Sequence, residues 1–108
     1  PTYIKNNRKI QIIKSLTLPA GIVKETNTDV FDKDIENNDI IVMCSDGILD
    51  SNIEYKNKEL WIKYLLEDIN VVNPQKIADI ILNESVDNNF GKIKDDMSVL
   101  VCKLIKKQ

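Results

Sequence analysis

Asp39-Ile40-Ile41-Val42-Met43-Cys44-Ser45-Asp46-Gly47 is the stretch of sequence on which the fold depends. Five apolar residues, 40–44, follow one another without a break, which is typical of a short strand covered on both faces. Asp46 then comes at the carboxyl end of that strand, and Gly47 frees the backbone to turn out of the core. The stretch therefore predicts a buried strand that brings one carboxylate to the edge of a sheet.

A second stretch near the other end of the chain has the reverse order. Asp95 and Asp96 come just before an apolar segment, 97–102. If the two strands are antiparallel neighbours, Asp46 and Asp95 meet at one rim of the sheet. Successive side chains on an extended strand point in opposite directions, so only one of Asp95 and Asp96 readily faces Asp46. Two converging carboxylates outline a site for a hard divalent cation, which removes their mutual repulsion.

Each acidic motif also has a purely structural explanation. An Asp-Gly pair after a strand is usually a turn, and two acids before a strand are usually solvated charges.

The composition limits the class of protein: the 108 residues include 43% hydrophobic and 30% charged side chains, with a net charge of −2. That is one domain or part of one, without a basic stripe to bind nucleic acid. The chain opens at Pro1 in a predicted strand, so we expect a piece of a longer protein.

The chain has no histidine, which excludes histidine general bases, Ser-His-Asp triads and histidine zinc sites. Cys44 and Cys102 each fall in a predicted buried strand, and we interpret them as core residues in a reducing compartment. A phosphocysteine phosphatase needs an arginine six positions after its cysteine. That position is Asp50, and the chain's arginine is Arg8, so this chemistry is excluded.

The order of predicted elements indicates an α+β fold with an antiparallel sheet. A hairpin turns at Asn6-Asn7, a loop crosses at 16–23, a short strand is expected at 29–31 and a turn at 36–39. A polar linker at 50–57 then leads to two consecutive helices and a final strand at 99–105.

The two predicted helices have apolar faces and clear boundaries. The first, 58–70, carries its stripe at Leu60, Trp61, Tyr64, Leu65 and Ile69, and we expect Trp61 and Tyr64 in the core. The second begins with Asn73 as N-cap and Pro74 as its first residue, and it ends near 88–89, before Gly91. Its predicted face is Ile77, Ala78, Ile81 and Leu82.

The segment 45–51 partly resembles the strand-end motif of haloacid-dehalogenase-like phosphotransferases. Their nucleophile is the aspartate two positions before the Asp-Gly pair, which is Cys44 here, and their threonine after the glycine is Ile48. Without the carboxylate that becomes a phosphoaspartate, the covalent mechanism cannot run.

Three motifs together resemble metal-dependent bacterial Ser/Thr phosphatases of the PPM type. Residues 39–50 resemble their strand followed by Ser-Asp-Gly, 95–101 their closing Asp-(Asp/Asn)-Met-(Thr/Ser)-Val motif, and 18–22 their Leu-Pro-hydrophobic-Gly loop. Within that family, residues 73–97 are most similar to the phosphatases that act in sporulation. The resemblance implies a β-sandwich of two antiparallel sheets flanked by α-helices, of which residues 1–108 would be the C-terminal half.

The resemblance also implies a function. The complete domain would hold two manganese or magnesium ions and hydrolyse a phosphoprotein by metal-activated water, with no enzyme-bound intermediate. Asp46 and Asp95 would be metal ligands, Asp96 would support them from the neighbouring position, and Ser45 and Gly47 would shape the turn. The implied substrate is a phosphorylated anti-anti-sigma factor, whose dephosphorylation releases a sigma factor. The domain would be cytoplasmic and its parent anchored in the membrane.

Two consequences follow if this chain is only half of such a domain. Two carboxylates cannot fill a roughly six-coordinate shell, so we expect weak manganese binding and no phosphatase activity from this chain alone. An uncovered sheet face and edge also predict self-association. The alternative is a non-catalytic interaction module on the same scaffold, in which the acids are only surface charge.

Overall fold

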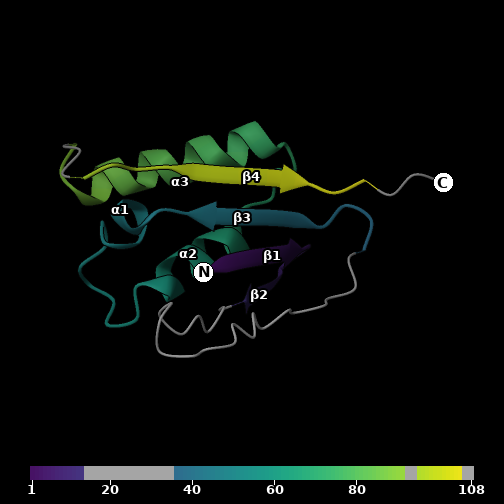
Figure 1. The fold of residues 1–108 in the computed structure, drawn as a ribbon, viewed down its shortest axis with the longest axis horizontal. Coiled ribbons are helices and arrows are strands. Elements are labelled where there is room, and N and C mark those ends of the chain that lie inside the picture. Colours follow the sequence, from purple (N-terminus) through teal and green to yellow (C-terminus); the bar gives the residue numbers. More distant parts are fainter. Residues whose placement is uncertain (14–35, 92–94, 106–108) are drawn as a thin grey trace, which may run out of the picture.

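A computed structural model of the protein describes residues 1–13, 36–91 and 95–105. Its elements are, in chain order, β1 (Thr2–Asn6), β2 (Lys9–Ile13), β3 (Ile40–Cys44), α1 (Asp46–Leu49), α2 (Glu59–Asp68), α3 (Pro74–Asn88) and β4 (Val99–Lys103) (Figure 1). Three consecutive helices between strands confirm the α+β class. The predicted loop at 16–23, strand at 29–31 and motif at 18–22 lie outside the described residues.

The four strands form one antiparallel sheet in the order β2-β1-β3-β4 (Figure 1). The predicted hairpin is β1–β2, in which Asn6 pairs with Lys9 and Asn7 turns the chain at φ 54°. β3 pairs with both β1 and β4, so it holds an interior position. Cys44 of β3 lies opposite Val99 of β4, which places the end of one strand beside the start of the other.

The turn predicted before β3 is also present. Asn38 adopts a positive φ of 71°, and the Asp39 backbone N–H donates to the Glu36 carbonyl over 3.2 Å. Asp39 is 3% exposed, and its carboxylate accepts from Asn6 Nδ2 at 2.7 Å and from the Glu36 N–H at 2.9 Å. This buried carboxylate therefore joins the end of β1 to the start of β3.

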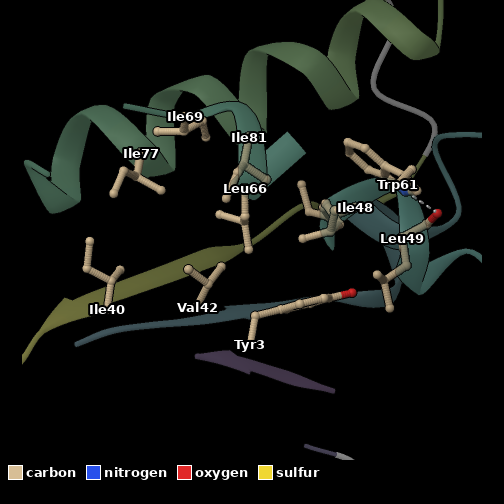
Figure 2. Packing of buried hydrophobic residues seen from close by; sticks show 11 residues of the cluster. Tyr3, Ile40, Val42, Ile48, Leu49, Trp61, Leu66, Ile69, Ile77 and Ile81 are labelled. Carbon is tan, nitrogen blue, oxygen red and sulfur yellow. Dashed lines mark hydrogen bonds between the residues drawn. The ribbon is translucent and has the colours of Figure 1, made fainter. Parts of the chain in front are cut away.

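The helices cover one face of the sheet and enclose the core (Figures 1 and 2). Tyr3, Ile40 and Val42 point from the sheet toward the helices. The buried apolar side chains that the helices and adjoining residues contribute are Ile48, Leu49, Trp61, Ile62, Leu66, Ile69, Ile77 and Ile81. Burial of this set against the sheet supplies the main apolar driving force for folding.

Side chains of β1 hold α2 at both ends. The Tyr3 hydroxyl donates to the Glu59 carbonyl at 2.8 Å, in the first turn of the helix. The Lys5 ammonium donates to the Leu66 carbonyl near the last turn. Trp61 Nε1 donates to the Leu49 carbonyl at 3.1 Å and so ties α2 to α1.

Both boundaries of α3 agree with the sequence analysis. The Asn73 side chain accepts from the Lys76 backbone N–H at 3.1 Å, and Pro74 is the first helical residue. Asn89 follows the last residue of the helix, and Gly91, at φ 77°, donates its N–H to the Val86 carbonyl at 2.9 Å. Ile77 and Ile81 are buried as predicted, whereas Leu82 is 38% exposed.

The predicted face of α2 is displaced. Trp61 is 4% exposed, as expected, but Tyr64 is 44% exposed and lies beside Tyr55, with ring centroids 6.0 Å apart. Ile62 and Leu66, which the stripe omitted, are fully buried. Apolar residues are so frequent in this segment that several faces of the helix are similarly apolar. Contact with the sheet therefore decides which face is buried.

The prediction that β3 and β4 are covered on both faces is wrong for the described chain. Met43 and Leu100, which pair across the two strands, are 46% and 58% exposed on the face away from the helices. Cys102 lies on the same face and is exposed, so it is not a core residue. An all-apolar strand requires a second layer, and that layer is not among the described residues.

Candidate metal centre

The two segments predicted to carry the site meet where β3 runs into α1, beside the start of β4. The Ser45 N–H donates to the Ser98 carbonyl at 2.9 Å. In return, the Ser98 N–H donates to the Ser45 hydroxyl oxygen at 2.9 Å, and that hydroxyl donates to the Asp96 carbonyl at 3.3 Å. Ser45 thus fastens the Ser-Asp-Gly segment to residues 96–98 through both its backbone and its side chain.

Gly47 allows these two segments to approach closely. It is buried, and a Cβ at this position would lie 2.1 Å from the Asp96 carbonyl oxygen and 3.5 Å from the Asp95 Cβ. No real Cβ tolerates the first distance, so the residue must be glycine unless the backbone of 95–96 moves. The role predicted for Gly47, freedom to turn, is not what the structure requires, because Gly47 lies within α1 and Gly91 is the positive-φ glycine among the described residues. Its role is to leave space for the acidic segment.

The predicted acidic residues occupy the surface around this contact. Asp46 is the first residue of α1 and is exposed. Asp95 and Asp96 are exposed too, and Asp95 Oδ1 accepts from the Asp96 backbone N–H at 2.8 Å. The structure thus brings the segment that carries Asp46 against the segment that carries Asp95, although the two are far apart in sequence.

The donor set suits a hard divalent cation, since carboxylate oxygens are the ligands that manganese and magnesium prefer. Within the described residues 1–13, 36–91 and 95–105, no three acidic, histidine or cysteine side chains cluster closely enough to hold a metal ion. The described residues therefore do not form a complete metal site by themselves.

The thiol of Cys44 is a poor nucleophile near neutral pH. Cys44 is the last residue of β3, and burial raises the pKa of its thiol to about 11, although the positive N-terminus acts in the opposite direction. Only the thiolate attacks phosphorus. The raised pKa therefore argues against Cys44 as a nucleophile.

Sequence reasoning missed the short helix α1 and the contacts that hold it. Ser51 is 2% exposed, donates to the Ile48 carbonyl at 2.7 Å, and accepts from Asn88 Nδ2 at 3.5 Å. These contacts anchor the segment after Asp46 to the end of α3. The region was expected to be turn and linker because four residues are too few to show a helical period.

Solved structures with this fold identify the class. The chain aligns over its full length with the manganese-presoaked phosphatase domain of the cell fate determinant SpoIIE from Bacillus subtilis, with a TM-score of 0.82, 28% identity and 48% of that chain covered. A structure of the PP2C phosphatase domain of that protein with a fragment of its regulatory domain gives a TM-score of 0.86 at 29% identity, with 99% of this chain and 32% of that chain covered. The fold is that of part of a PP2C phosphatase domain, the name used here for the PPM type.

The sequence comparisons identify the family. The family model for stage II sporulation protein E matches residues 1–105. Stage II sporulation protein E of Priestia megaterium is 36% identical over 104 residues, which are 96% of this chain and 18% of that protein. The chain belongs to the stage II sporulation protein E family, and it spans about a fifth of this relative and about half of the phosphatase domain described above. No helix in the described part of the chain is long and apolar enough to cross a membrane.

Proposed function

We propose that this chain is the C-terminal half of a metal-dependent phosphoprotein Ser/Thr phosphatase domain and that Asp46 and Asp95 bind manganese or magnesium in it. The observation that carries this proposal is the close approach of Gly47 to Asp96, which brings the two acidic segments together at one rim. The membership of the chain in a family whose solved domains are phosphatases supports it.

The chain's own residues would arrange the ligands. Ser45 fixes the end of β3 to residues 96–98, Gly47 leaves room for the Asp95-Asp96 backbone, and the Asp96 N–H orients the Asp95 carboxylate. Bound divalent ions would supply Lewis acidity and an activated water for attack on phosphorus. Because the chain spans about half of the solved phosphatase domain, we place the remaining ligands in the other half.

For the substrate we propose a phosphorylated anti-anti-sigma factor, whose dephosphorylation releases a sporulation sigma factor. The name of the family supports a role in sporulation. We further propose a membrane-anchored parent that presents this domain to the cytoplasm.

A manganese titration tests the proposed ligands on the 108-residue chain. We expect manganese to raise the melting temperature of the wild type, and expect this shift to shrink in Asp46→Asn and Asp95→Asn. Asp68→Asn is the matched control, because Asp68 is an exposed aspartate at the C-terminal end of α2 and belongs to neither acidic segment. Equal shifts in all four proteins would support the interaction module instead.

Activity is tested by adding the missing half. We expect no turnover of a serine phosphopeptide by the 108-residue chain and manganese-dependent turnover by the complete domain of the same parent. Turnover by the chain alone would overturn the proposal that its metal shell is incomplete, and a complete domain without activity would overturn the assignment as a phosphatase.

A further inference from the structure

A cavity of about 520 Å³ lies at the end of the sheet opposite to Asp46 and Asp95. Ile40 at the start of β3 and Lys103 at the end of β4 line it, whereas the acidic rim lies at the other ends of these two strands (Figure 1). The turn of the β1–β2 hairpin, the turn before β3 and the segment 69–72 after α2 complete its wall. This volume is within the range of small-molecule sites.

The lining of the cavity is cationic and rich in amides. Lys5, Arg8 and Lys103 contribute three positive charges, and five asparagines line the cavity as well. Among the residues that the structure describes, no aspartate or glutamate lines it, and the amide of Asn6 donates to the nearby Glu36 and Asp39 carboxylates. The same wall carries an apolar part that includes Val72, which is 60% exposed. In a chain whose net charge is −2, three cationic side chains in the described lining of one cavity are a local concentration of positive charge.

Lys5 is buried beside the cavity. It is 4% exposed, and its ammonium donates one hydrogen bond to the Leu66 carbonyl. An ammonium group has three donors, so further ones remain for a ligand. Burial and the neighbouring Arg8 lower the pKa of Lys5, while Glu67 acts in the opposite direction. The charged form of Lys5 is therefore incompletely compensated by the protein.

Arg8 and Lys103 are also available to contact an anion. Among the residues that the structure describes, neither Arg8 nor Lys103 takes part in an ion pair. Arg8 follows Asn7, whose positive φ of 54° shapes the hairpin turn on the cavity wall. Three like charges around one hollow repel one another, and a bound anion removes that repulsion. A guanidinium and ammonium groups lining one cavity suit a phosphate, which accepts several charge-assisted hydrogen bonds.

We propose that this cavity binds a phosphate-bearing small molecule, with Arg8, Lys103 and Lys5 contacting the phosphate. The volume exceeds that of a phosphate group, so the asparagine amides and the apolar wall would hold the remainder of the molecule. This site is separate from the proposed metal centre and requires none of its residues.

A titration with inorganic phosphate, without divalent metal and followed by amide chemical shifts, tests the proposal on the 108-residue chain. We expect saturable shifts at Asn7, Asn38 and Asn70, on three separate segments of the cavity wall. We expect Arg8→Gln and Lys103→Gln each to weaken binding about tenfold, the loss of one charge-assisted hydrogen bond. Lys76→Gln is the charge-matched control, because Lys76 is exposed on α3 and does not line the cavity.

The control should bind phosphate like the wild type, and sodium chloride at equal ionic strength should not reproduce the shifts. Wild-type binding by both Arg8→Gln and Lys103→Gln, or equal shifts with chloride, would overturn the proposal. Asp46→Asn should bind phosphate like the wild type, whether or not it loses the response to manganese. The phosphate site and the metal centre are therefore tested independently.

Discussion

The carbonyl oxygen of Asp96 lies 2.1 Å from where a side chain on Gly47 would begin. This contact joins two motifs that are far apart in sequence, and it explains why a glycine follows Asp46. A turn alone would tolerate other small residues at position 47. The backbone of residues 95–96 packs so closely against this position that no side chain fits there.

Gly47→Ala should therefore destabilise the fold by about 1–3 kcal/mol, the usual cost of forcing extra volume into a packed site. The comparison is Gly91→Ala, where a Cβ meets nothing within 4 Å and only the positive φ of 77° opposes the change. Amide shifts should spread to residues 95–98 in Gly47→Ala and remain near the end of α3 in Gly91→Ala. Urea unfolding and amide spectra measure both, and a Gly47→Ala protein with wild-type stability would show that the contact is not rigid.

The sequence predicted those features that depend on neighbouring residues. The hairpin at Asn6-Asn7 and the ends of α3 at Asn73 and Gly91 have chemistry that acts within a few positions. The meeting of the Ser45–Gly47 and Asp95–Asp96 segments was predicted from antiparallel pairing alone.

The features that sequence reasoning missed depend on partners elsewhere in the chain. The buried face of α2 is chosen by contact with β1, through Tyr3 and Lys5, and no local pattern contains that information. The exposure of Met43 and Leu100 depends on which layers are present, because the apolar run itself is the same with or without a second sheet. α1 is too short to have a period.

The corrected face of α2 can be tested by truncation. Leu66→Ala should cost about 2–5 kcal/mol, because it empties a fully buried position in the core. Tyr64→Ala should cost about 1 kcal/mol or less, since Tyr64 is 44% exposed and mainly contacts Tyr55. Chemical denaturation gives both values, and a larger loss from Tyr64→Ala would restore the stripe predicted from the sequence.

Lys5 should make stability depend on pH. Burial, with Arg8 nearby, lowers the pKa of Lys5 below its ordinary value of 10.5, so above the folded-state pKa the unfolded chain holds a proton that the folded chain lacks. Stability therefore rises with pH through that interval. We expect the unfolding free energy of the wild type, relative to Lys5→Met, to increase as pH rises from neutral toward 10.5. The raised pKa of Tyr3 affects both proteins and cancels in the difference. A difference independent of pH would contradict the lowered pKa.

The open sheet face predicts self-association of the 108-residue chain. Met43 and Leu100 present an apolar surface next to β4, which is an edge strand of the sheet. Leu100→Glu should shift sedimentation from dimer or larger species toward monomer. Leu82→Glu, a comparable change at a 38% exposed position on α3, should leave the association unchanged. A wild-type chain that sediments as a monomer would contradict this prediction.

The most direct test of the central claim is where manganese binds. Manganese is paramagnetic and broadens the amide signals of nearby residues, so a titration of the 108-residue chain at low manganese maps the site without any need for activity. We predict that the amides of Asp46, Gly47, Asp95 and Asp96 broaden first and together, and that this joint broadening is lost in Asp46→Asn. Broadening that begins at other acids, or that affects residues 46 and 95 at unrelated manganese concentrations, would contradict a shared metal site at this rim.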